Sequence, residues 1–144
     1  MIALPCLCAN LRRAARVLTQ RYEEKLRPLG ITSTHFTILQ ALSLAGEVSQ
    51  GRLGEILGMD STTLTRTLGI MKKRGWVAIR RGADRRERLL RMSTAGKTQY
   101  AQALPHWQAV QDEVRRQLGK KRWRNLMKLT NTVASSAAEQ GDLS

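Results

Sequence analysis

A short basic segment within a strand-loop-strand pattern constrains the fold most. Residues 84–91 read Asp-Arg-Arg-Glu-Arg-Leu-Leu-Arg. Two strand-like runs, Trp76 to Arg80 and Arg88 to Met92, flank a loop that holds Gly82 and Asp84, and the basic segment extends from this loop into the second run. Such a charged hairpin is not expected in a core, because burying unpaired charge is strongly unfavourable. We therefore predict an exposed hairpin whose arginines contact a polyanion.

Two short helical patterns precede this hairpin. The first starts after Ser49, a residue of the N-cap type, and stops at Gly58. The second starts after Asp60, also a capping residue, and stops at Gly75. The turn Gly58-Met59-Asp60 joins them, so the pattern predicts a helix-turn-helix unit in which the second helix is the reader.

The second helix has one apolar face and one polar face. Leu64, Leu68 and Met71 recur at helical spacing and are expected to face the core. Arg66, on the polar face, is the favoured base reader because its guanidinium can pair with guanine. The predicted DNA contacts on this helix are Ser61, Thr62, Thr63, Thr65, Arg66, Lys72 and Lys73. The alternative is that Ser61 and Thr62 only cap the helix and position phosphates.

A helix-turn-helix followed by a basic hairpin predicts a winged helix-turn-helix, mainly α with a small β-hairpin wing. The wing is expected to reach the DNA backbone or the adjacent minor groove, which attracts arginine where it is narrow. The predicted wing contacts are Arg80, Arg81, Asp84, Arg85, Arg86 and Arg88. The alternative is a wing that is only solvated.

The charge balance indicates the class of partner. The chain has 25 Lys and Arg against 11 Asp and Glu, a formal net charge of +14, which favours nucleic acid or an anionic membrane surface. No apolar stretch approaches the roughly 20 residues that span a bilayer, and no signal peptide is evident, so we expect a cytoplasmic protein and no membrane partner. A non-specific basic protein that binds RNA or shapes nucleic acid is the rival class, although a winged helix-turn-helix suits duplex grooves better.

Catalytic and metal-binding patterns are missing from the sequence. There is no P-loop, nucleophile elbow, zinc-protease motif or paired carboxylate site, so we expect no enzyme activity, catalytic residue or cofactor. Cys6 and Cys8 are too close to bond well with each other, and no nearby residues complete a zinc site. His35 and His106 are isolated in the sequence and support no metal site.

The chain ends carry apolar stripes that the helix-turn-helix unit cannot cover. One helix is expected from Pro5 to Gly30, and two more follow Thr94, the first being bent or broken at Pro105. We predict a homodimer formed by both ends of the chain. The expected parts are an N-terminal dimerisation helix over 1–30, a winged helix-turn-helix domain over 31–97, and C-terminal dimerisation helices over 98–144.

In this order of elements the chain resembles the MarR family of bacterial transcriptional regulators. The family pattern D-x-R…L-x-L-T-x-x-G is matched by Asp84, Arg86, Leu90, Met92, Ser93 and Gly96, with Met92 and Ser93 in place of Leu-Thr. The stretch DSTTLTRTLGIMKKRG from residue 60 is similar to the family's recognition helix and its exit. The resemblance implies that Asp84 orients the wing while Arg86 inserts into DNA. It also implies a regulator of transcription that binds double-stranded DNA, expected to be a repressor, with an activator as the alternative.

A second resemblance is to the organic-hydroperoxide-sensing branch of that family. Cys8 falls at the branch's cysteine position relative to Leu29-Gly30-Ile31-Thr32, and Tyr22 matches one of two tyrosines that bond the sulfur, whereas Arg12 replaces the other. A helix N-terminus and Arg12 both favour a thiolate. Cys8, Tyr22 and Cys6 are thus candidate redox residues. The alternatives are cysteines buried in a dimer contact, or a phenolic or amphipathic inducer bound near Trp107, Tyr22 and Phe36.

Overall fold

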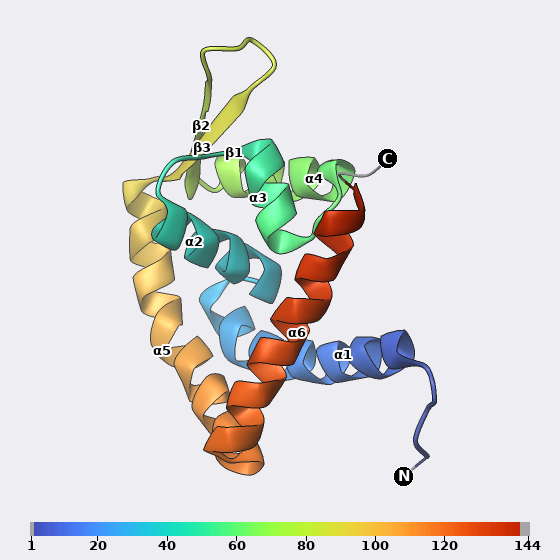
Figure 1. Cartoon of the computed structure of the whole chain (residues 1–144). Helices are drawn as coiled ribbons and strands as arrows, with labels where there is room; N and C mark the ends of the chain where they lie inside the picture. Colours follow the sequence, from blue (N-terminus) through green and yellow to red (C-terminus); the bar gives the residue numbers. More distant parts are fainter. Residues whose placement is uncertain (1, 142–144) are drawn as a thin grey trace. The chain divides into compact units, whose positions relative to one another are not determined.

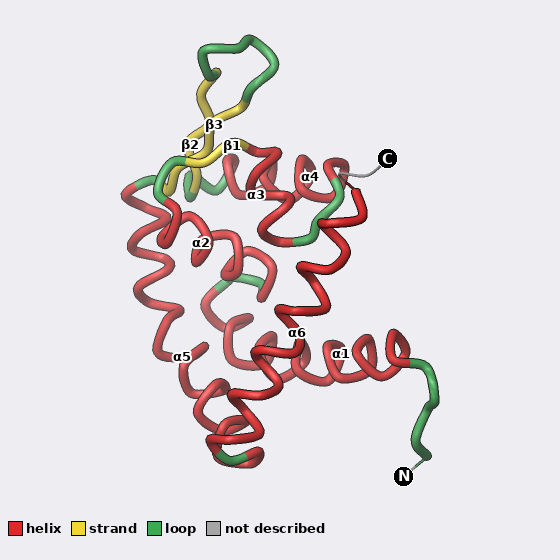
Figure 2. Tube along the Cα trace, in the orientation of Figure 1, coloured by secondary structure: helices red, strands yellow, loops and turns green. Residues whose placement is uncertain are grey.

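The structure, a computed structural model, is mainly helical with one small antiparallel sheet, which confirms the predicted fold class (Figures 1 and 2). It describes residues 2–141, and side chains up to residue 136. The chain divides into two compact units, Met1–Trp107 and Gln108–Ser144. The elements are α1 (Leu7–Leu26), the 3-10 helix η1 (Arg27–Leu29), α2 (Ser33–Ala45), β1 (Val48–Ser49), α3 (Gln50–Leu57), α4 (Ser61–Lys73), β2 (Val77–Arg81), β3 (Arg88–Met92), α5 (Thr94–Leu118) and α6 (Lys120–Gly141).

Local capping sets where the central helices begin. Thr32 accepts a hydrogen bond from the backbone N–H of His35 at 3.1 Å and starts α2. Ser49 starts α3, accepting from the backbone N–H of Arg52 at 3.1 Å. Asp60 caps α4 in the same way. Each cap satisfies an amide that has no partner inside its helix, so the predicted starts after Ser49 and Asp60 are confirmed.

The first helix differs from its prediction at both ends. It begins at Leu7 with Cys6 as the N-cap residue, so Pro5 lies outside the helix. It ends at Leu26, and Arg27–Leu29 form a 3-10 turn instead of a last α-helical turn. Pro28 explains this change, because it has no N–H to donate and is tolerated only in the first turn of a helix.

A bend or a break was expected at Pro105, and the structure contradicts the break. Helix α5 runs without interruption from Thr94 to Leu118, with Pro105 inside it. A proline within a helix removes one hydrogen bond and costs about 3 kcal/mol. Buried residues on both sides of the proline, Ala103 and Val110, offset that cost because both depend on the helix continuing.

The wing belongs to a three-stranded sheet in the order β1-β3-β2, all antiparallel. Strand β3 is central: Leu90 faces Val48 on one side and Ile79 on the other. The hairpin of β2 and β3 was predicted, whereas the two-residue strand β1 was not. Because β1 runs directly into α3, the sheet ties the base of the wing to the start of the helix-turn-helix unit (Figure 1).

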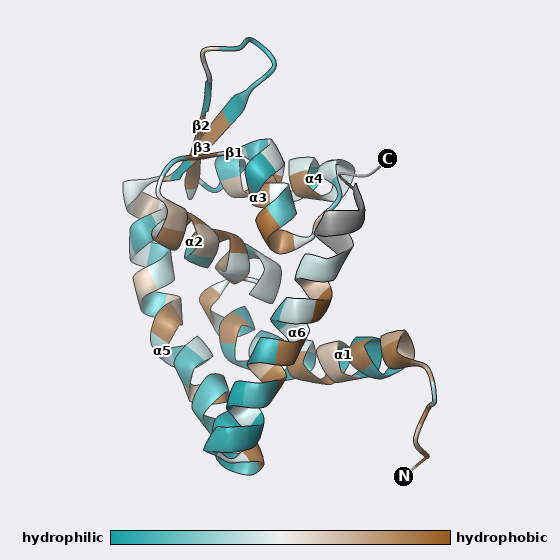
Figure 3. Cartoon of the chain, in the orientation of Figure 1, coloured by the Kyte–Doolittle hydropathy of each residue, from teal (hydrophilic) through white to brown (hydrophobic). Residues whose placement is uncertain are grey.

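The core of the first unit lies behind α4 and the sheet. Leu64, Leu68 and Met71 are each at most 1% exposed, which confirms that this face of α4 points inward. The ring of Phe36 stacks with those of Tyr100 and Trp107, at centroid distances of 5.3 and 5.4 Å. The loop of the wing is mostly hydrophilic (Figure 3). Core packing thus holds α4 with its polar face outward.

Candidate nucleic-acid interface

Helix α4 presents every predicted contact to solvent. The predicted contacts, all of them exposed, are Ser61, Thr62, Thr63, Thr65, Arg66, Lys72 and Lys73. Hydrogen bonds from Thr63 hold the pKa of the capping carboxyl of Asp60 below its usual value, so Asp60 stays ionised at the positive end of the helix. Lys72 and Lys73 occupy the last turn, where a cation is favourable. The helix therefore combines a stable start with an exposed polar and basic face.

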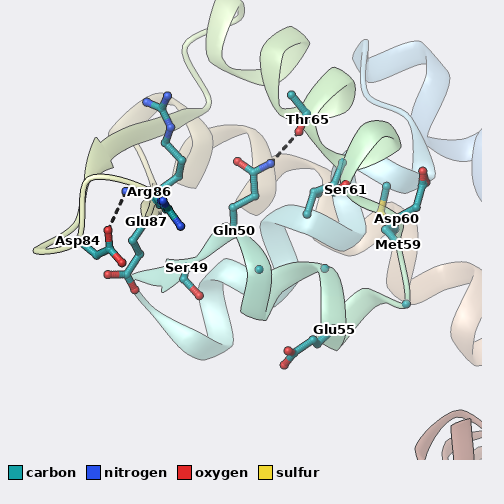
Figure 4. Close-up of a pocket in the computed structure, with 15 residues that line it drawn as sticks. Ser49, Gln50, Glu55, Met59, Asp60, Ser61, Thr65, Asp84, Arg86 and Glu87 are labelled. Atoms are coloured by element: carbon teal, nitrogen blue, oxygen red, sulfur yellow. Dashed lines mark hydrogen bonds between the residues drawn. The ribbon is translucent and has the colours of Figure 1, made fainter. Parts of the chain in front are cut away.

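A groove of about 1110 Å³ separates this helix from the wing (Figure 4). It is formed by α3, the turn after it, the start of α4 and the loop and base of the wing. It brings together five of the predicted residues: Ser61, Thr65, Asp84, Arg86 and Arg88. The predicted residues Thr62, Thr63, Arg66, Lys72, Lys73, Arg80, Arg81 and Arg85 are exposed but do not line the groove.

Asp84 organises the tip of the wing. Its carboxylate Oδ1 accepts a hydrogen bond from the backbone N–H of Arg86 at 3.1 Å, an Asx turn (Figure 4). Its carbonyl accepts from the backbone N–H of Glu87 at 2.9 Å, and the carbonyl of Glu87 accepts from Gly82 at 2.9 Å. These bonds turn the backbone so that Arg85 and Arg86 remain exposed at the tip.

The base of the wing is pinned by an ion pair. Arg80 donates through Nε and Nη2 to the two carboxylate oxygens of Glu47, at 2.9 and 2.5 Å. This contact lowers the pKa of Glu47 below its usual value. Arg80, predicted as a DNA contact, is therefore engaged with a carboxylate 33 residues earlier in the chain. In this structure Arg80 holds the wing to the loop before β1.

Ser93 secures the exit of the wing. Its backbone N–H donates to the carbonyl of Trp76 at 3.0 Å, and its hydroxyl donates to the carbonyl of Gly75. The same hydroxyl oxygen accepts from the backbone N–H of Gly96 at 3.0 Å. One short polar side chain therefore joins the end of α4, the end of β3 and the start of α5, which explains Ser or Thr at this point of the wing pattern.

The sequence did not reveal two residues of this site, Gln50 and Glu47. Gln50 lines the groove and donates from Nε2 to the hydroxyl oxygen of Thr65 at 2.9 Å (Figure 4). The only hint in the sequence that Gln50 belongs to the site is its position directly after the capping Ser49, because a residue there projects from the start of a helix. No local pattern could identify a partner 15 residues away.

The candidate redox residues lie apart from the groove, on and just before α1. Cys6 and Cys8 are exposed free thiols at the start of that helix. Tyr22 is half-buried against the core, and burial raises the pKa of its hydroxyl. Among the described residues, no cluster of His, Cys, Asp or Glu could hold a metal ion. Within the same residues, none of the helices has the length and apolar character needed to cross a membrane.

Comparison with known proteins agrees with this geometry. The sequence model of the MarR family matches residues 29–87. The transcriptional regulator MosR of M. tuberculosis, solved in complex with DNA, is 34% identical and superposes with a TM-score of 0.83 over 93% of this chain and 97% of its own. A single-residue mutant of MarR from E. coli, solved with operator DNA, is 25% identical with a TM-score of 0.79, over 88% of this chain and 92% of its own.

A curated relative gives the same picture. The uncharacterized HTH-type transcriptional regulator YwoH of Bacillus subtilis is 29% identical over 94 residues, which cover 65% of this chain and 69% of that protein. These relatives are transcriptional regulators and not enzymes, in agreement with the expectation from sequence. Fold, wing pattern and relatives together show that this chain belongs to the MarR family of transcriptional regulators.

Proposed function

We propose that the chain is a repressor of transcription that recognises a specific sequence in double-stranded DNA. The groove that places Ser61 and Thr65 of α4 opposite Arg86 and Arg88 of the wing carries this proposal. Helix α4 enters the major groove, and the wing follows the backbone to the adjacent minor groove. Since its target is the chromosome, we place the protein in the cytoplasm.

The active form in this proposal is a homodimer on an inverted-repeat operator. Apolar side chains are exposed near both ends of the chain, among them Leu7 and Val17 on α1 and Leu129 and Val133 on α6. A second copy would bury such residues through a two-fold interface. Two recognition helices then reach half-sites about one helical turn apart.

Two binding experiments test this proposal: selection of bound duplexes from a random pool, and titration of the selected duplex with protein at several salt concentrations. We expect an inverted repeat to be selected, and affinity to fall steeply with salt because phosphate contacts release counterions. Arg86→Ala should weaken binding and reduce the slope of log affinity against log salt by about 1.8, because each of the two subunits loses one phosphate contact. Arg16→Ala, which removes an equal charge from α1, is the matched control and should change the slope less.

Two outcomes would contradict the proposal. Selection that yields no sequence preference would favour the non-specific basic nucleic-acid-binding protein. Structured RNA that displaces the protein as well as duplex DNA does would favour the RNA-binding form of that rival.

Thiol oxidation is the release signal that the exposed cysteines support. The thiolate of Cys8 attacks the terminal oxygen of an organic hydroperoxide, so that an S–O bond forms, the O–O bond breaks and an alcohol leaves after taking a proton. The sulfur is oxidised to sulfenic acid by two electrons, and the hydroperoxide is reduced. Cys8 lies in the first turn of α1, close to the proposed dimer contact. Cys8→Ser should then hold DNA in the presence of hydroperoxide; release equal to that of the parent protein would exclude this signal.

A phenolic or amphipathic inducer is the competing signal. The aromatic residues considered for its cleft are packed: Phe36 is 1% exposed and stacks on Trp107. Tyr22 also packs against the core. A ligand at this place would have to open that packing. Release of DNA by a simple phenolic acid such as salicylate, unchanged in Cys8→Ser, would favour an inducer over oxidation.

A further inference from the structure

One hydrogen bond joins the two helices of the helix-turn-helix unit on the side that faces the groove. The amide Nε2 of Gln50, in the first turn of α3, donates to Oγ1 of Thr65 in the second turn of α4, at 2.9 Å. Gln50 is half-buried and Thr65 is exposed, and both line the groove between α4 and the wing (Figure 4). The bond therefore lies where a base edge would meet the protein.

Thr65 differs from the other helical threonines in how its hydroxyl is used. Five of them donate their proton to a carbonyl of the preceding turn of their own helix: Thr37, Thr67, Thr98, Thr130 and Thr132. In Thr65 the hydroxyl oxygen accepts from Gln50 instead. Within the described residues, the proton of this hydroxyl has no acceptor, so it is available to a ligand in the groove.

The backbone next to Gln50 is held in place at the root of the wing. Ser49, the residue before it, pairs with Leu89 of the central strand β3 and also caps α3. The backbone of Gln50 is thus tied to the wing sheet, and its side chain spans from there to α4. A fixed donor on one side of Thr65 leaves the hydroxyl proton directed away from Gln50, because the oxygen's nearer lone pair is occupied.

We propose that Gln50 is a positioning residue that makes Thr65 a hydrogen-bond donor to a base edge and so sets one position of the operator. This inference rests on the proposed function. In the major groove, a donor matches the N7 of a purine or the O4 of thymine, whereas cytosine presents the N4 amino donor. Thr65 held in this state favours an acceptor edge at its position and disfavours cytosine.

Duplex selection with paired variants tests the proposal. Thr65→Val removes the hydroxyl at nearly constant volume and should lose the preference at one base pair of each half-site, by about 3- to 10-fold, as expected for one neutral hydrogen bond. Gln50→Ala should relax the same position, and adding it to Thr65→Val should change nothing further, since both act through one contact.

Gln50→Glu gives the sharper prediction. A carboxylate only accepts hydrogen bonds, so the hydroxyl of Thr65 would donate to it and present a lone pair to the DNA. Preference at the same position should then move toward a donor edge such as cytosine N4. A side chain that merely braces the two helices would not produce this reversal.

Thr67→Val is the matched control. It makes the same substitution on the same helix, but the hydroxyl of Thr67 is already bonded to the carbonyl of Thr63 at 2.9 Å. Its selected sequences should equal those of the parent protein. Thermal unfolding of each variant separates loss of recognition from loss of fold.

The outcomes distinguish this inference from the proposed function. If the parent protein selects no sequence at all, the proposed function fails. If it selects an inverted repeat but Thr65→Val weakens all sequences equally, Thr65 contacts a phosphate and this inference is overturned. It is also overturned if Gln50→Glu keeps the parent's preference at every position.

Discussion

At the scale of single residues, one position of the wing pattern accepts only glycine, because a neighbouring backbone leaves no room for a side chain. This position is Gly96: a Cβ there would collide with the carbonyl oxygen of Trp76 and crowd Met92. That carbonyl also accepts the hydrogen bond from Ser93 that closes the wing. The glycine of the wing pattern is therefore explained by packing and needs no role in recognition.

Gly96→Ala should destabilise the fold by about 1–3 kcal/mol, because the clash is with backbone, which cannot rotate away. Urea unfolding measures the change. Gly69→Ala is the control, since Gly69 lies in α4 with open space around its missing Cβ. It should gain up to about 1 kcal/mol from helix propensity. Equal effects of the two substitutions would contradict the packing argument.

His35 makes folding stability depend on pH. Burial, and then the charge of Arg74, lower the pKa of His35 below its ordinary 6.5. Its Nδ1 accepts from the backbone N–H of Thr32 at 3.4 Å, and its ring packs edge-on against Trp76. The unfolded chain therefore binds the proton more tightly than the folded chain, and the stability contribution is complete above about pH 6.5 and is lost as pH falls toward the lowered value.

We expect the urea midpoint to fall between pH 7.5 and 5, and part of this fall to disappear in His35→Gln. Glutamine at this third helical position keeps an acceptor for the N-cap amide but does not titrate. The difference between the two pH profiles gives the contribution of His35 alone, because the carboxylates titrate in both proteins. Parallel pH profiles would show that His35 does not contribute.

At the scale of elements, the wing is held to the rest of the first unit at its base, whereas its tip is exposed. Strand β1 pairs with β3, and the Glu47–Arg80 pair holds β2 to the loop before β1. Both partners are exposed, so this pair adds little to global stability. Its effect is local, because it sets the direction of the wing and occupies one of the wing's cations.

Glu47→Gln should free Arg80 to contact a phosphate. We expect the slope of log affinity against log salt to steepen by about 1.8, one phosphate contact for each subunit of the proposed dimer, with stronger binding at low salt. Glu24→Gln on α1, an exposed residue, gives the same charge change away from the groove. Weaker binding in Glu47→Gln would mean that direction of the wing matters more than the extra cation.

At the scale of the whole molecule, the formal net charge of +14 suits DNA, and the exposed apolar side chains at both ends are the basis for the proposed homodimer. The predicted division into 1–30, 31–97 and 98–144 assigns dimerisation to the ends. The structure's own division falls at Trp107, and compactness does not show which segments dimerise. That assignment stays a prediction.

Leu129→Glu combined with Val133→Glu should produce a monomer, because two like charges would face each other across a two-fold interface. Sedimentation should then give the chain mass of 16.2 kDa instead of twice that value. Leu44→Glu is the control: Leu44 is 85% exposed at the end of α2 and should leave the dimer intact. A parent protein that sediments as a monomer would refute the homodimer.

The sequence by itself determined the helix starts at Ser49 and Asp60, the inward face of α4 and the wing hairpin. Caps, helical spacing and turn residues act within about four positions, so the code for them is local. Only the tertiary structure decided the rest: β1 beside β3, Arg80 on Glu47, Gln50 on Thr65, and a helix that continues through Pro105. These features depend on groups brought together by packing from distant parts of the chain, and no local pattern specifies which groups will meet.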